Sequence, residues 1–101
     1  MELNFKLDNF EGPLELLLHL VESKEMSIYE ISISKIIDEY LILISNLTEN
    51  NVQIKVEFLV MAAELLEIKA ISILNYKKKL EREKSLEQKI TDYKAIKYLA
   101  N

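Results

Sequence analysis

The sequence has no cysteine and no tryptophan, and it has only one glycine (Gly12), one proline (Pro13) and one histidine (His19). The lack of cysteine excludes disulfides and thiolate metal sites. Turns between strands depend on glycine and proline, so their scarcity favours an all-helical fold. No apolar run approaches the roughly 20 residues of a membrane span, and residues 1–8 lack the apolar core of a signal peptide. We therefore expect a soluble, cytoplasmic protein.

The chain has 101 residues, half of them hydrophobic and 30% charged. This length suits one small domain with one core. The net charge of −4 disfavours a stand-alone nucleic-acid-binding protein, which needs surplus lysine and arginine to neutralise phosphates. Composition thus favours one helical domain and disfavours a nucleic-acid-binding function.

Apolar periodicity predicts a small bundle of about four helices, with a long and central third helix. The expected helices cover residues 13–23, 34–46, 52–75 and 85–100. Before them, Leu3, Phe5 and Leu7 alternate with polar residues, which predicts a short extended arm. Residues 77–84 are highly charged and form either a loop or exposed helix. Within the second helix, Ile42 is an apolar exception among polar positions.

The third helix has two apolar seams, although a surface helix needs only one. The first seam consists of Phe58, Met61, Leu65, Ile68 and Ser72. The second consists of Leu59, Ala63, Leu66, Ala70 and Ile73. Both alternate spacings of three and four residues, which suits packing against other helices. Either a closed four-helix domain buries both seams, or one of them is an interface.

We expect the second seam to pack inside the domain, because Ala63 and Ala70 allow close helix approach. The first seam would then face a partner, where the adaptable Met61 is useful. The internal core predicted in this way consists of Leu17, Ile36, Tyr40, Ile44, Leu59, Ala63, Leu66 and Ala70. The alternative is a self-contained homodimer, or a generic helical interaction module, that buries both seams itself.

Three segments of the sequence are distinctive. They are FEGPLELLLHL at 10–20, IYEI at 28–31 with the following Ile36 and Tyr40, and EFLVMAAELLEIK at 57–69. In order and spacing they resemble the amino-terminal region of the bacterial kleisins, and the likeness covers the whole chain. The resemblance implies that residues 1–101 are a kleisin amino-terminal helical domain without the family's carboxy-terminal winged helix.

The resemblance also implies a function. Kleisins are non-catalytic subunits of condensin-like SMC complexes for chromosome condensation and segregation, and their amino-terminal helices join the coiled-coil neck of an SMC subunit in a helical bundle. By this analogy the expected neck-binding residues are Ile42, Phe58, Met61, Leu65, Ile68, Lys69 and Ser72. A dimer of the accessory protein ScpB is the second expected partner, and its binding region could begin within residues 76–101. We expect a nucleoid association, with DNA contacted only through the complex.

The chain departs from the kleisin pattern at two places. Ser32 stands where the family often has proline, so the break before the second helix is expected to be softer. Ala70, Ile71, Ser72 and Asn75 replace a run that usually ends in a proline. Without that proline, we expect the third helix to be free to continue into residues 76–79.

Catalytic and metal-binding patterns are weak. Glu15, His19 and Glu22 share a stripe at helical spacing, which we interpret as a solvated face. No glycine-rich phosphate loop or nucleophile motif is present. Lysines 77–79 are followed by Arg82 and Lys84, and the glutamates at 81, 83 and 87 are interspersed with these basic residues. This segment is therefore also interpreted as solvated. We therefore expect no enzyme activity, no cofactor, no metal site and no small-molecule substrate.

Overall fold

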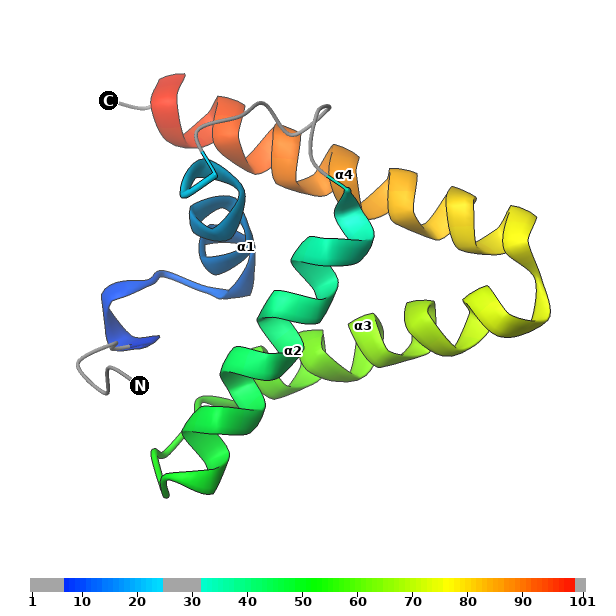
Figure 1. The fold of residues 1–101 in the computed structure, drawn as a ribbon. Coiled ribbons are helices and arrows are strands. Elements are labelled where there is room, and N and C mark those ends of the chain that lie inside the picture. The colour runs from blue at the N-terminus through cyan, green and yellow to red at the C-terminus, as the bar shows by residue number, and fades with distance from the viewer. Residues whose placement is uncertain (1–6, 25–31, 100–101) are drawn as a thin grey trace.

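The computed structural model describes residues 7–24 and 32–99, without the side chains of residues 72 and 73. Within these ranges the chain is all-α, as the sequence predicts. A short 3-10 turn, η1 (Leu7–Asn9), precedes α1 (Pro13–Glu22), α2 (Ile33–Glu49), α3 (Val56–Leu74) and α4 (Tyr76–Leu99). In Figure 1, α3 and α4 diverge from their shared corner, α1 lies at the open end, and α2 crosses the bundle. No described helix is long and apolar enough to cross a membrane.

The first helix begins where the sequence places it. Gly12 is extended (φ −176°) and Pro13 occupies the first helical turn, where its missing N–H is not needed. The backbone N–H of Glu11 donates to the Glu15 carboxylate at 2.9 Å. This hydrogen bond holds the Glu15 carboxylate against the backbone that precedes α1.

The second helix extends past the predicted end at Asn46 to Glu49. It ends in a Schellman motif, in which Asn51 adopts a left-handed conformation (φ 60°). The N–H of Val52 donates to the Leu47 carbonyl at 2.9 Å, and that of Asn51 to the Thr48 carbonyl at 3.1 Å. Asparagine tolerates this conformation better than other non-glycine residues, so it ends the helix in a chain with almost no glycine.

The expectation that the third helix continues into residues 76–79 is wrong. Asn75 leaves the helical conformation (φ −154°, ψ 96°) and divides α3 from α4. Its N–H still donates to the Ile71 carbonyl at 2.8 Å, and its side-chain Oδ1 accepts the N–H of Lys78 at 3.0 Å. Asn75 thus ends one helix and caps the next. Residues 77–84, for which both loop and helix were open, form the exposed first turns of α4.

The core lies where the four helices meet. Leu17, Ile36, Tyr40 and Ile44, predicted to be internal, are all buried. The Tyr40 hydroxyl donates to the backbone carbonyl of Phe58 at 2.9 Å, so α2 and α3 share a buried hydrogen bond. Leu7 is also buried, whereas Leu3 and Phe5 of the predicted arm lie outside the described residues.

The fourth helix docks on the bundle through a stripe of three residues spaced three or four apart. Leu86 and Ile90 are buried, and Tyr93 packs against the core. These residues bring α4 against α1, α2 and α3. The four described helices therefore surround one shared core. The apolar side chains that lie outside this core define the candidate site.

Candidate protein-binding interface

The structure reverses the predicted roles of the two seams of α3. Phe58, Met61, Leu65 and Ile68, which were expected to face a partner, are buried in the domain's own core. Phe58 retains 1% of its exposure and Leu65 none. The physical reason is volume, because these large side chains fill the space between α3 and its three neighbours, where alanines would leave voids.

The second seam, predicted to be internal, lies on the outside. Leu59 and Leu66 are 44% and 56% exposed. Ala63 is exposed between them, and Ala70 is exposed one turn after Leu66. Val56 and Val60 add two more exposed apolar side chains on the same side of the helix. The two alanines do not bring a neighbouring helix of the domain close, and instead leave the outer surface of α3 shallow. The side chains of Ser72 and Ile73, one from each seam, lie outside the described residues.

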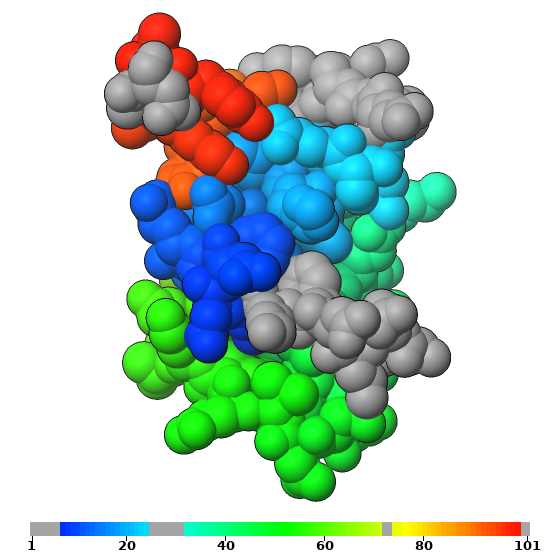
Figure 2. All heavy atoms as spheres, turned by 90° about the vertical axis from the view of Figure 1, so that its left-hand side faces the viewer, coloured from blue at the N-terminus to red at the C-terminus, as the bar shows by residue number. Residues whose placement is uncertain are grey.

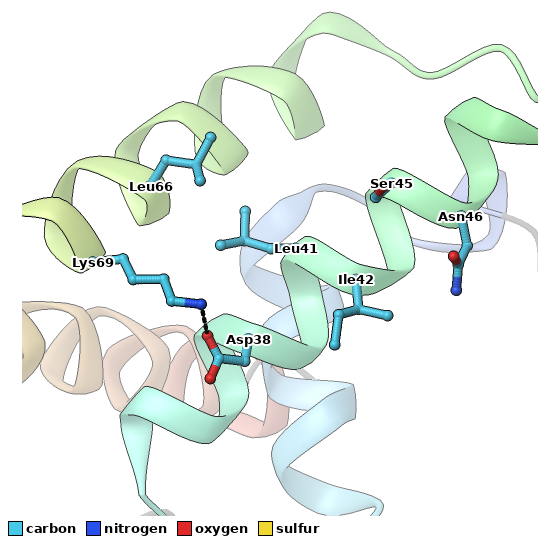
Figure 3. A pocket seen from close by; sticks show the side chains of 7 residues that line it. All are labelled: Asp38, Leu41, Ile42, Ser45, Asn46, Leu66 and Lys69. Carbon is cyan, nitrogen blue, oxygen red and sulfur yellow. Dashed lines mark ion pairs between the residues drawn. The ribbon is translucent and has the colours of Figure 1, made fainter.

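A groove between α2 and α3 continues this exposed surface. It is lined by Asp38, Leu41, Ile42, Ser45, Asn46, Leu66 and Lys69, with a volume of about 480 Å³. Figure 3 shows Leu66 of α3 and Leu41 of α2 pointing toward one another across it. Ile42, the apolar exception in the sequence, is 60% exposed and belongs to the α2 wall. We define the docking face by its exposed apolar residues: Ile42, Val56, Leu59, Val60, Ala63, Leu66 and Ala70.

Two ion pairs tie α3 to its neighbours on either side of the docking face. The Lys69 ammonium lies 2.6 Å from the Asp38 carboxylate of α2, a contact visible at one end of the groove in Figure 3. The Arg82 guanidinium of α4 lies 2.7 Å from the Glu67 carboxylate. Both pairs are largely solvent-exposed, so each stabilises the fold by roughly 0–1 kcal/mol.

The predicted neck-binding residues are therefore divided. Ile42 and Lys69 line the groove beside the docking face, whereas Phe58, Met61, Leu65 and Ile68 lie in the core. Sequence reasoning missed Val56 and Val60 as exposed residues. The available signal was their position, since both precede residues of the outer seam by three or four places and so share its side of the helix.

A second polar cluster joins α1 to the end of α4. The Tyr93 hydroxyl donates to the Glu11 carboxylate at 2.6 Å, and the Lys97 ammonium lies 3.1 Å from the Glu15 carboxylate. The Tyr98 hydroxyl donates to the Glu22 carboxylate at 3.1 Å. Figure 2 views this side, where the N-terminal turn and α1 lie between the end of α4 and the junction of α2 with α3.

These contacts correct the interpretation of Glu15 as part of a solvated stripe. The backbone N–H of Glu11 and the hydrogen bond from Lys97 lower the pKa of the Glu15 carboxyl, and the same bond raises the pKa of Lys97. Burial, and then the hydrogen bond to Glu11, raises the pKa of Tyr93. Among the described residues no group of three acidic or histidine side chains is placed to hold a metal ion. The cluster fastens α4 to α1.

Comparison with known proteins identifies the family of this chain. The family model described as Segregation and condensation protein ScpA matches residues 20–98. The chain belongs to this family. Segregation and condensation protein A of Clostridium acetobutylicum is 40% identical over 108 residues, which cover 100% of the chain and 43% of the relative. The Clostridium perfringens protein is 45% identical over 102 residues (94% and 41%), and that of Listeria welshimeri 39% over 110 (99% and 44%).

The chain thus spans about two fifths of the length of these ScpA relatives. The segments that carry the family resemblance form defined parts of the fold. Residues 10–20 form the entry to α1 and most of that helix, and residues 57–69 form most of α3. Residues 28–31 lie outside the described residues. The docking face lies within residues 20–98, the range that the ScpA family model matches.

Proposed function

We propose that this chain is the amino-terminal part of a non-catalytic kleisin subunit that acts in chromosome segregation and condensation. In this proposal its docking face packs against the coiled-coil neck of an SMC subunit. The observation that carries the proposal is the outer side of α3, where a continuous apolar seam has no covering helix within the described part of the chain. Family membership supplies the biological role, and the exposed seam supplies the means of binding.

The pattern of the face favours a partner with two helices. In heptad notation the exposed apolar residues of α3 occupy the a, d and e positions: Val56, Ala63 and Ala70 (a), Leu59 and Leu66 (d), Val60 and Leu74 (e). The e position between the last two is Glu67, which pairs with Arg82. A helix that packs on a single partner needs only a and d, whereas three apolar positions per heptad suit a helix in a bundle. A coiled coil offers two such helices, and α3 would lie in the furrow between them.

The energy available from this face is moderate. Full burial of a leucine, isoleucine or valine side chain is worth roughly 1.5–3 kcal/mol. Because Ile42, Leu59 and Leu66 are each about half exposed, covering each of them is worth about 1 kcal/mol. We therefore expect each to contribute a small share of the affinity, with no single dominant residue.

The proposal changes the predicted contact residues. Ile42 and Lys69 stay at the interface, and Leu59, Ala63, Leu66 and Ala70 replace the four buried residues of the inner seam. By the same family resemblance, a ScpB dimer would bind beyond or within α4, and DNA would be reached only through the assembled complex. The chain would then act in the cytoplasm, at the nucleoid.

The test is calorimetric titration of the chain with an SMC head-and-neck fragment. The double variant L59E/L66E places two charges on the docking face and should abolish binding while far-UV circular dichroism shows an unchanged helix content. The control is I96E, because Ile96 is also an exposed apolar residue (69%) but lies on α4. This control should bind like the unmodified chain.

Two results would overturn the proposal. The first is the absence of micromolar binding by the unmodified chain. The second is unchanged binding by a folded L59E/L66E variant. Sedimentation of the chain alone separates the alternative in which the same face forms a homodimer, since a tight dimer that L59E/L66E dissociates would assign the docking face to self-association.

A further inference from the structure

Two exposed glutamates follow one edge of the docking face. Glu57 and Glu64 are seven residues apart on α3, so their side chains lie on the same side of the helix and about 10 Å apart along its axis. Val60 lies three residues after the first and four before the second, and is therefore their neighbour on the helix surface. Both glutamates are exposed, and their carboxylates have no ion pair or hydrogen bond within the ranges that the structure describes.

The other charges around the face are compensated. Glu67, on the same helix, meets Arg82 at 2.7 Å. On the α2 side, Lys69 meets Asp38 at 2.6 Å. The docking face is therefore bordered on the α2 side by a compensated charge pair. On its other side Glu67 is paired, whereas Glu57 and Glu64, nearer the start of α3, leave two negative charges uncompensated among the described residues.

We propose that the partner helix seated along this edge carries lysine or arginine at two positions about seven residues apart, each facing one of the two glutamates. This inference rests on the proposed function and adds the chemistry of its partner. A helix that covers the seam approaches to an axis separation of about 8–10 Å, which removes water from the rim and strengthens any charge interaction there.

The charge pattern would mainly determine which partner helix binds and in which axial register. Complementary rim charges raise the association rate and fix the register, and like charges placed opposite one another reject a wrong partner. A basic pair with heptad spacing matches Glu57 and Glu64 in one axial position, whereas a shift of the partner by one turn leaves a carboxylate unmatched. The apolar seam alone tolerates such a shift, because its side chains repeat every three or four residues.

The test compares charge variants in the same titration with the SMC head-and-neck fragment. Affinity would be measured at about 50 mM and about 300 mM NaCl, since added salt screens exposed charges. The variants are E57Q/E64Q and E57K/E64K, with E81Q/E87Q as a control of equal charge change on α4. We expect E57Q/E64Q to weaken binding about 3- to 10-fold at low salt and to reduce its salt dependence. The E57K/E64K variant should bind more weakly still, and the control should bind like the unmodified chain.

Two outcomes overturn the inference alone: low-salt binding of E57Q/E64Q equal to that of the unmodified chain, or an equal loss in E81Q/E87Q. In both cases L59E/L66E would still abolish binding, so the proposed function would stand without the charge match. If the unmodified chain shows no binding, the proposed function fails and the inference fails with it. All four charge positions are exposed or partly exposed, so we expect every variant to fold.

Discussion

Leu65 and Leu66 are adjacent in sequence but point about 100° apart around α3, one into the core and one outward. Their separate replacement by alanine tests the assignment of the two seams. Leu65 is fully buried, whereas Leu66 is 56% exposed. A buried leucine-to-alanine change costs about 2–5 kcal/mol, from lost burial and from the cavity left behind. Out of a total stability of about 5–15 kcal/mol for a chain of this length, that loss is large. The change at Leu66 should stay within about 0.5 kcal/mol.

Thermal unfolding followed by circular dichroism gives the readout. A loss of about 3 kcal/mol corresponds to a decrease in Tm of roughly 12–24 °C for a domain of this size, and 0.5 kcal/mol to at most about 4 °C. Binding should follow the opposite order, with Leu66→Ala weakening the SMC interaction about 5-fold and Leu65→Ala sparing it at temperatures where that variant is folded. A larger decrease in Tm for Leu66→Ala than for Leu65→Ala would refute the inside-outside assignment.

Three further predictions concern contacts that hold the helices together. Tyr40→Phe removes a buried hydroxyl that donates to a carbonyl of α3 at 2.9 Å, and urea unfolding should show a loss of about 1–2 kcal/mol; an unchanged midpoint would contradict it. Asn75→Ala removes the side-chain cap of α4 and should cost about 1 kcal/mol, measurable as a decrease in Tm, while an increase would mean that the corner is strained. The pKa of Glu15 is lowered by the N–H of Glu11 and by Lys97, so its contribution to stability is complete above its ordinary value of 4.5 and is lost as pH falls through the lower folded value. Glu15→Gln should therefore flatten the acid limb of the stability curve, and an acid limb equal to that of the unmodified chain would exclude this role.

Much of the secondary structure was predictable because it depends on local chemistry. The apolar periodicity located all four helices, and Pro13 located the start of α1. The predicted third helix, residues 52–75, ends within a residue of α3, but the lack of a proline there led to the wrong expectation that it continues into residues 76–79. Asparagine is a good N-cap, and Asn75 stands before a run of helix-forming residues, so a local signal for the corner was present.

The inside and outside of α3 were predicted the wrong way round. Periodicity shows that two seams exist, but it is the same for both and does not say which one the domain covers. The argument from close helix approach favoured Ala63 and Ala70 as internal, whereas the space between α3 and three other helices needed large side chains such as Phe58 and Leu65. Side-chain volume, summed over each seam, was the more informative signal.

The sequence alone determined that this chain is helical, that its third helix has more apolar surface than one side can bury, and that it resembles the kleisins. These properties follow from spacing and composition, which do not depend on where other helices lie. Only the tertiary structure decided which seam is covered, where α4 docks, and that Glu57 and Glu64 follow an open apolar face. Each of these depends on distances between residues far apart in the chain, and such distances are set by how the helices pack together.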